Sequence, residues 1–337
     1  MSAKRARGLQ LLVGDVGGTN VRLALYESAG NDLQLLVERN YASREHRGVA
    51  EILERFLDES FFRSDRLCLG VAGPVRDGRC AVTNLPWVVD AGELAARLHL
   101  HHAWLLNDLE AFAYGLSELA PRDFALISPG EERPEGNAAL IAAGTGLGEA
   151  GLFWDGTGWR PFATEGGHAG FAPESELEIE LLRFLRRRGG RVTWERVLSG
   201  PGLVSLFEFF LARAGAVAPV WFTEARDHSD PAAAISAAAS EGRSQEAIYA
   251  LDLFVRLYGV EAGNLALKMK ATGGVFLGGG IAPKMLGRLQ SGAFLEAFHG
   301  KEPMRELLER IPVRVVTHRS AALLGAARYA RLAAPAS

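Results

Sequence analysis

The sequence predicts an α/β protein of two domains that each repeat the order βββαβαβα. A chain of 337 residues is long for one domain, because single hydrophobic cores rarely grow beyond about 250–300 residues. Strand patterns alternate with helix patterns, and several strands end at glycine-rich turns, which is typical of sheets covered by helices. Since no low-complexity linker separates the halves, we expect two closely packed units with a cleft between them.

The first half opens with an apolar run from Leu11 that leads into a tight turn and then into two strands. The cluster at 28–32 is rich in turn-forming residues and joins these two strands. Apolar residues such as Ile52, Leu53 and Phe56 recur at helical spacing in the next segment. The expected elements are strands over 19–26 and 33–40, a helix over 48–60, strands over 66–72 and 79–83, a helix over 90–98, a strand over 103–106 and a helix from residue 109.

The second half shows the same order of a strand, a Gly/Thr turn and two further strands. Its helical part is longer, and Asp230 followed by Pro231 is a typical helix start. The expected elements are strands over 137–143, 149–154 and 158–163, helices over 174–188, 193–198, 201–214, 231–240 and 244–270 with a possible break near Gly259, a strand over 274–278, a helix over 282–290, a strand over 313–317 and a helix over 320–332.

Composition narrows the function classes. A net charge of −3 argues against nucleic acid as the main partner. The chain has only two cysteines, Cys68 and Cys80, which excludes a disulfide scaffold and suggests buried thiols in a reducing compartment. No apolar stretch approaches the ~18 residues that span a bilayer, and the run before Asp15 is too short for a signal peptide. We therefore expect a cytoplasmic protein without a membrane partner.

The first glycine turn, Gly14–Asn20, has the features of an anion site. Gly17 and Gly18 lack side chains and permit backbone angles closed to other residues, so that successive N–H groups can point at one ligand. Asp15 would repel a bare phosphate but would attract a phosphate that arrives with Mg2+. The alternative is an ordinary hairpin in which Gly-Gly forms the turn.

Two further glycine clusters follow strands, at 144–148 and at 273–281. Residues 144–151 contain G-x-G-x-x-G, at Gly146, Gly148 and Gly151, but a dinucleotide site requires a helix after this motif, and the residues here predict a strand. No G-x-x-x-x-G-K-[ST] occurs. Two Gly/Thr hairpins at equivalent places in two halves can hold a polyphosphate from both sides, and the third cluster leaves room for an adenine ring. This pattern favours a nucleotide-dependent phosphotransferase.

Five motifs occur in order along nearly the whole chain, and together they closely resemble those of bacterial glucokinases. The motifs are Gly14–Asn20, Leu106–Asp108, Ala143–Gly148, Glu165–His168 and Glu195–Gly202. The resemblance implies the actin-like ATPase (ribonuclease H-like) fold that hexokinases and Hsp70 chaperones share. It implies a small domain over 8–118 and 319–337, a large domain over 119–318, and transfer of the γ-phosphoryl group of ATP to the 6-hydroxyl of glucose.

The resemblance also implies site residues. The nucleotide and its Mg2+ are expected at Gly14, Asp15, Gly17, Gly18, Thr19, Asn20, Gly144, Thr145, Gly146, Gly279 and Gly280, with Asp15 on the metal through water and phosphates. The sugar is expected at Asn84, Asn107, Asp108, Glu165, His168 and Glu195, which supply paired donors and acceptors for hydroxyls. Asp108 is expected to be the catalytic base, since a carboxylate beside the 6-hydroxyl can take its proton.

Each of these residues also has a structural interpretation. Asn107 and Asp108 can cap a helix, His168 can be a core histidine bonded to backbone, and Glu195 can favour a helix N-terminus. Related kinases of the repressor, open reading frame and kinase group carry a cysteine-rich zinc motif after Glu-x-x-His. This chain has none there, so we expect no zinc.

Three other functions are compatible with parts of the pattern. A kinase for mannose, fructose or an N-acetyl hexosamine would use similar polar residues. A sugar-responsive regulator would usually carry a helix-turn-helix before the first strand, where only about nine residues are expected here. A polyphosphatase of the same fold would not need the hydroxyl-binding set. The resemblance further implies a homodimer.

Overall fold

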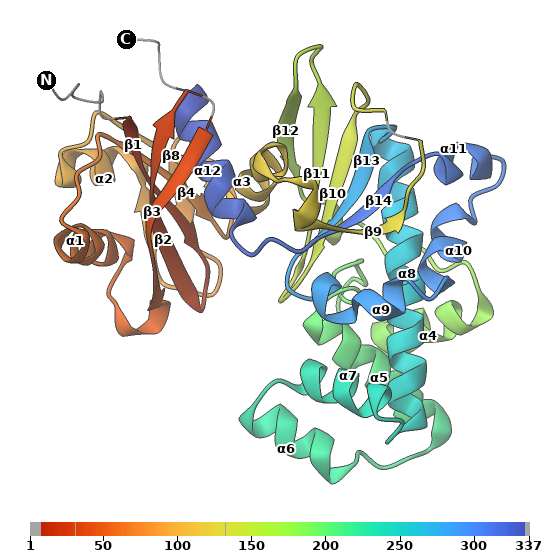
Figure 1. Ribbon diagram of the computed structural model, residues 1–337. Helices are drawn as coiled ribbons and strands as arrows, with labels where there is room; N and C mark the ends of the chain where they lie inside the picture. The colour runs from red at the N-terminus through yellow and green to blue at the C-terminus, as the bar shows by residue number, and fades with distance from the viewer. Residues whose placement is uncertain (1–7, 31, 132, 334–337) are drawn as a thin grey trace, which may run out of the picture. The chain divides into compact units, whose positions relative to one another are not determined.

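The structure is a computed structural model that describes residues 8–30, 32–131 and 133–333 (Figure 1). Asn31 in the predicted 28–32 turn and residues 334–337 of the predicted small domain lie outside the described residues. The chain divides into two compact units, with boundaries at 121/122 and at 317/318. The sequence placed these boundaries at 118/119 and 318/319.

The first unit contains a five-stranded sheet in the order β3-β2-β1-β4-β8 and a three-stranded sheet in the order β5-β6-β7. Its elements are β1 (Leu9–Val16), β2 (Asn20–Ala29), β3 (Asp32–Ala42), α1 (Val49–Ser60), β4 (Arg66–Val71), β5 (Val75–Arg76), β6 (Arg79–Ala81), β7 (Val88–Asp90), α2 (Ala91–Leu98), β8 (His102–Asn107), α3 (Asp108–Gly115) and α12 (Ala321–Leu332).

The larger sheet of this unit is buried on both faces. β1 pairs antiparallel with β2 and parallel with β4, which pairs parallel with β8. Buried side chains of α1 and α2 join one core cluster, and those of α3 and α12 join the other. Because β1, β4 and β8 are parallel, their carboxyl ends meet at one edge, where α/β proteins bind ligands.

The second unit contains a six-stranded sheet in the order β12-β11-β10-β13-β14-β9. Its elements are β9 (Phe124–Ser128), β10 (Ala138–Ala143), β11 (Leu147–Trp154), β12 (Trp159–Thr164), α4 (Glu176–Arg187), α5 (Gly200–Ala214), α6 (Val220–His228), α7 (Pro231–Ser240), α8 (Gln245–Met269), β13 (Gly274–Gly278), α9 (Leu286–Leu289), α10 (Ala293–His299), α11 (Arg305–Glu309) and β14 (Val313–Val316).

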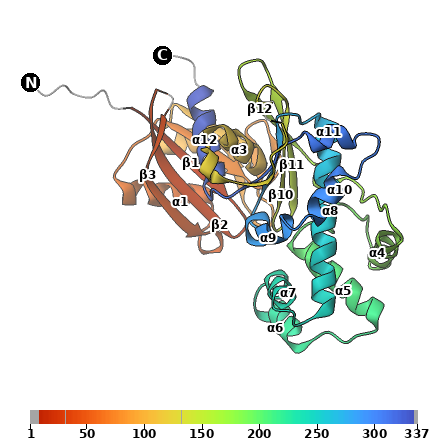
Figure 2. The same ribbon diagram turned by 45° about the vertical axis from the view of Figure 1, so that its right-hand side comes forward.

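The first five strands of this order repeat the order of the first unit, so the predicted duplication of the βββαβαβα core is confirmed. As in the first unit, the third and fourth strands of the sheet order, here β10 and β13, pair in parallel. The long helix α8 packs on β10, and α10 lies along α8 (Figure 2). Asp230 accepts hydrogen bonds from the backbone N–H groups of Ala232 and Ala233, as predicted for the start of α7.

Three predictions about helices were wrong. Residues 193–198 form hydrogen-bonded turns instead of a helix. α8 continues without a break at Gly259. The glycine there serves close packing instead, since a Cβ would lie 2.2 Å from the Phe294 carbonyl. The predicted helix over 282–290 begins as a 3-10 helix and contains only the short α9.

Other strands and α-helices were not predicted, namely β5, β7, β9, α6, α10 and α11. All are short, between two and nine residues, so periodicity gives little signal for them. Both cysteines are buried and free, as predicted. None of the helices in the described part of the chain is long and apolar enough to cross a membrane.

Candidate functional site

The turn between β1 and β2 is held open by backbone and hydroxyl contacts. The Gly17 N–H donates to the Asn20 carbonyl at 2.9 Å, and the Ser43 hydroxyl donates to the Gly17 carbonyl at 2.9 Å. Neither Gly17 nor Gly18 has a positive φ, so the expected need for unusual backbone angles was wrong. Gly18 instead allows the Thr83 carbonyl to approach closely, since a Cβ at Gly18 would lie 3.2 Å from that oxygen.

Asp15 lies on β1 opposite Arg22 on β2. The two side chains form an ion pair, with 3.3 Å between Arg22 Nη2 and Asp15 Oδ2. Burial raises the pKa of Asp15, and the Arg22 charge opposes that shift. Arg22 also donates to the Arg319 carbonyl at 2.8 Å. The sequence did not single out Arg22, although cross-strand pairing with an acid is a signal that a hairpin register can reveal.

Asn107 and Asp108 lie where β8 ends and α3 begins. Asn107 is the N-cap, and its side-chain oxygen accepts from the N–H groups of Leu109 and Glu110 at 3.0 and 3.4 Å. Its Nδ2 donates to the Gly73 carbonyl at 3.2 Å. The capping interpretation of Asn107 is therefore confirmed, and this cap fixes the position of Asp108 as the first residue of the helix.

The Asp108 carboxylate is partly buried at this edge of the sheet. Burial and the nearby Asp108 charge both raise the pKa of the Cys80 thiol. Gly70 of β4 lies between the two segments. A Cβ at Gly70 would lie 3.6 Å from the Asp108 Cα and 3.8 Å from the Gly14 carbonyl oxygen. The turn after β1 and the start of α3 therefore lie at the same edge of the first unit.

Asn84 also lies beside this turn. Its Cβ would be 3.5 Å from a Cβ at Gly18. Asn84 is exposed and has a φ of 65°, a left-handed conformation that asparagine tolerates. The first unit therefore brings together the predicted residues 14–20, Asn84, Asn107 and Asp108.

In the second unit, Glu195 joins two of the predicted motifs. Its Oε2 accepts from the Leu147 N–H at 3.0 Å, and a Cβ at Gly146 would lie 2.5 Å from the same oxygen. Its own N–H donates to the Gly167 carbonyl at 2.9 Å, and the Gly200 N–H donates to the Gly144 carbonyl at 2.8 Å. The helix-start interpretation of Glu195 was wrong, since no helix begins there.

Glu165 precedes a short 3-10 helix over Gly166–His168, and His168 is its last residue. Their side chains are 71% and 63% exposed, with 3.9 Å between Glu165 Oε2 and His168 Nε2. His168 is thus no core histidine, and both side chains are accessible to a ligand.

The glycines after β13 differ in their surroundings. Gly279 has a φ of 79°, and a Cβ there would lie 2.3 Å from the Ala143 carbonyl at the end of β10. Gly280 has no atom within 4 Å of where a Cβ would be. Gly279 therefore fixes this turn beside Gly144, while Gly280 faces open space.

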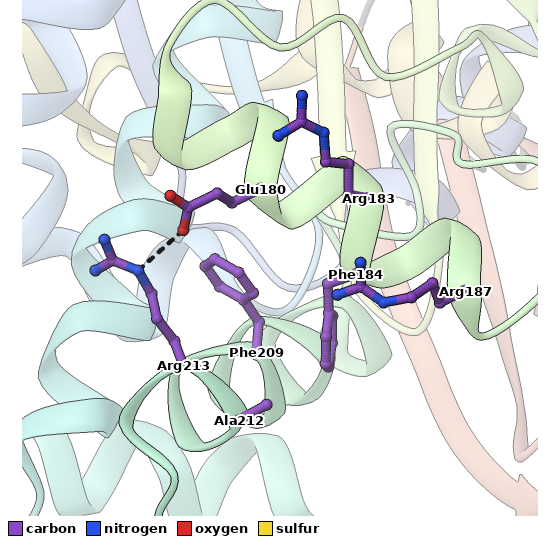
Figure 3. Close-up of a pocket in the computed structure, with 7 residues that line it drawn as sticks. All are labelled: Glu180, Arg183, Phe184, Arg187, Phe209, Ala212 and Arg213. Carbon is purple, nitrogen blue, oxygen red and sulfur yellow. Dashed lines mark hydrogen bonds and ion pairs between the residues drawn. The ribbon is translucent and has the colours of Figure 1, made fainter.

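A separate pocket of about 220 Å³ lies between α4 and α5. Figure 3 shows the ion pair of Glu180 on α4 with Arg213 on α5, at 3.0 Å, and Arg183 and Arg187 further along α4. None of the predicted site residues lines it, so it is distinct from the residues described above.

Comparison with known proteins gives consistent results. A family model described as Glucokinase matches residues 12–333. The Glucokinase of Nostoc punctiforme is 38% identical over 332 residues, covering 94% of this chain and 97% of the relative. The Glucokinase of Yersinia pestis is 35% identical over 320 residues, covering 95% and 96%.

Two solved structures place the fold. A glucokinase from an Antarctic psychrotroph has a TM-score of 0.84 at 32% identity, covering 96% of this chain and 98% of that chain. A ROK family glucokinase from Streptomyces griseus, in complex with glucose and AMPPNP, has a TM-score of 0.62 at 20% identity, covering 96% and 99%. The latter shows the fold alone, and the predicted actin-like ATPase fold is confirmed.

Proposed function

The chain belongs to the glucokinase family, and from this premise we propose that it transfers the γ-phosphoryl group of ATP to the 6-hydroxyl of glucose. The products are glucose 6-phosphate and ADP. The observation that carries the proposal is the family match over residues 12–333, which includes every predicted site residue. The protein is accordingly a hexokinase-type phosphotransferase.

Within this reaction, Asp108 is the proposed general base. It takes the proton of the 6-hydroxyl as that oxygen attacks the γ-phosphorus. Support comes from its position at the carboxyl edge of the sheet, where the Asn107 cap holds the first turn of α3. Most of the rate should come from positioning and charge stabilisation, because the transition state for phosphoryl transfer is loose.

The other polar residues have distinct proposed roles. Asn84, Asn107, Glu165, His168 and Glu195 bind glucose hydroxyls, and the turns 14–20 and 144–146 bind phosphates. Asp15 binds Mg2+ through water and phosphate oxygens, the arrangement that this ion prefers. Of the glycines after β13, we assign Gly280 to the adenine ring, because it faces open space while Gly279 packs against Ala143.

The test is ADP release from Mg-ATP with a panel of hexoses, comparing the wild type with Asp108→Asn. We expect glucose-dependent turnover, and a kcat that is lower by about 10²–10⁴-fold in the variant, the usual contribution of a general base. Glucose binding, measured by calorimetry, should be retained. The matched control is Glu93→Gln, which alters an exposed first-turn acid of α2 and should leave kcat unchanged.

Each outcome of this experiment has a clear meaning. Full activity of Asp108→Asn would remove this residue as the base. Stronger ADP release with mannose, fructose or an N-acetyl hexosamine would replace glucose as the substrate, and no sugar-dependent release would end the kinase proposal in favour of a sensor. We also propose a cytoplasmic homodimer, which light scattering would test.

A further inference from the structure

Glu149 lies beneath the sugar-binding motif, at a position that the proposed reaction does not use. It belongs to β11 and pairs with Thr164 of β12. The Thr164 hydroxyl donates to the Glu149 carbonyl at 2.9 Å and accepts from the Gly166 N–H at 3.2 Å. The backbone of Glu149 is thereby connected to the turn that carries Glu165 and His168.

The side chain of Glu149 contacts the same turn from below. Only 1% of Glu149 is exposed. A Cβ at Gly166 would lie 1.9 Å from Glu149 Oε2 and 2.6 Å from its carboxyl carbon. No larger residue fits at 166 unless the carboxyl moves, so the position of this carboxyl determines the position of the turn.

Glu149 faces a second buried acid, Glu261 of α8, which is fully buried. Glu261 accepts hydrogen bonds from Asn264 Nδ2 at 2.8 Å and from Lys268 Nζ at 3.2 Å. Glu149 Oε1, in contrast, is buried and has no hydrogen-bond partner among the described residues. Two ionised carboxylates facing each other without a donor would be strongly unfavourable.

One proton resolves this arrangement. Burial and the Glu261 charge raise the pKa of Glu149. Burial also raises the pKa of Glu261, but Asn264 and Lys268 oppose that shift. Glu261 is therefore the better anion of the two, and Glu149 is the better site for the proton.

We propose that Glu149 is protonated, donates a hydrogen bond to Glu261, and in this form positions the Glu165–His168 turn to bind glucose. This inference rests on the proposed function, since it assumes that the turn binds the sugar. Glu149 acts through Gly166 and touches no substrate, so it is a positioning residue.

The inference predicts a pH dependence with a definite sign. A group whose pKa is raised by folding contributes most at low pH, and that contribution is lost as pH rises through the folded-state pKa. Loss of the proton would place two negative charges beneath Gly166, with Lys268 of α8 as the facing cation and the exposed Glu165 and His168 at the ends of the turn. The KM for glucose should therefore rise at alkaline pH, while the KM for ATP changes little.

The first test is the pH profile of the KM for glucose in the wild type and in Glu149→Gln, between about pH 6 and about pH 9. Glutamine is neutral, keeps the shape and donates to Glu261 permanently. We expect the wild-type KM to rise by about 10-fold, which corresponds to about one pKa unit of coupling, and the variant to show no such rise. The same rise in Glu149→Gln would overturn the inference.

The second test separates positioning from general stability. Gly166→Ala should raise the KM for glucose because its Cβ collides with the Glu149 carboxyl. Because this collision requires the carboxyl, Gly166→Ala should cause little further rise in a Glu149→Ala background, whose KM is already raised by loss of the positioning residue. An equal rise in both backgrounds would overturn the inference. Failure of the proposed function would look different, because the wild-type protein would then show no glucose-dependent ADP release. In that case this inference would fail as well.

Discussion

The two units share a strand order but bring a carboxylate to their glycine turns in different ways. In the first unit the acid is Asp15, which belongs to the first strand and pairs across the hairpin with Arg22. In the second unit the acid is Glu195, which comes from a segment outside the sheet and accepts from the Leu147 N–H. A repeated backbone topology therefore does not repeat the chemistry of its turns.

The units also differ in what is inserted between the shared strands. The first unit carries the small sheet β5-β6-β7 after β4, whereas the second carries the helices α4 to α8 between β12 and β13. The second insertion includes the turns at 193–199 that supply Glu195. Glu195, a residue that we propose to bind the sugar, therefore comes from an insertion into the common core, as expected for functional segments placed on a rigid scaffold.

The largest effect that this comparison of the two units predicts distinguishes their two turns directly. Glu195→Ala would leave the Leu147 N–H without its acceptor and would loosen both the 144–147 turn and the contact with Gly167. We expect kcat/KM to fall by about 10–100-fold, since an unsatisfied buried donor costs about 1–3 kcal/mol. The measurement is steady-state kinetics with both substrates varied.

The matched variant is Glu195→Gln, which keeps an acceptor oxygen in place. It should lose less than Glu195→Ala. Equal losses in the two variants would mean that the hydrogen bond to Leu147 does not hold the turn.

A second comparison uses the helix crossings of the two units. A Cβ at Gly325 of α12 would lie 1.7 Å from the Ala111 carbonyl of α3, and one at Gly259 of α8 would lie 2.2 Å from the Phe294 carbonyl. Gly325→Ala and Gly259→Ala should each destabilise the protein by about 1–3 kcal/mol, the usual range for overpacking. Denaturant unfolding measures this loss.

Only the first of these variants should also lower kcat, because α3 begins with Asp108. The control is Gly287→Ala, at a position where nothing lies within 4 Å of the added Cβ, and its stability should stay close to that of the wild type. Equal loss of kcat in Gly325→Ala and Gly259→Ala would mean that the packing of α3 against α12 has no specific effect on the proposed base, Asp108.

The sequence predicted most of the repeated strands, because strands such as β1, β4, β10 and β13 are apolar runs that lead into glycine turns. It failed at 193–198, where the residues favour a helix locally but Trp194, Val197 and Leu198 are instead buried in the core of the second unit. Tertiary packing there overrides local propensity. The possible break near Gly259 does not occur for a related reason, because a glycine at this position allows α8 to pack closely against the Phe294 carbonyl.

The predicted site residues were found through motifs, and motifs name residues without their contacts. Glycine spacing could not show that Gly18 provides space for Thr83, or that Gly166 lies on a buried carboxyl. Glu149 itself follows Gly148 in a strand pattern and gave no signal, because its partner Glu261 is 112 positions away in the chain. Contacts of that separation are visible only in the folded structure.

The smallest expected effect concerns the charge that distinguishes the first turn. Burial raises the pKa of Asp15, so the ionised form opposes folding, and this penalty is absent below the unfolded-state pKa and present as pH rises through the folded-state pKa. Without ligands, Asp15→Asn should therefore melt about 2 °C higher at neutral pH, as ~1 kcal/mol would produce. The gain should vanish below about pH 4.

Calorimetric melting curves across this pH range would check the prediction, with Glu195→Gln as the comparison. Glu195 accepts from a backbone N–H, so its replacement should give no comparable gain. If Asp15→Asn instead melted lower at neutral pH, the ion pair with Arg22 would outweigh burial. The Asp15–Arg22 ion pair would then stabilise the first turn, as Glu195 stabilises the second. The two units would differ only in the segment that supplies the acid.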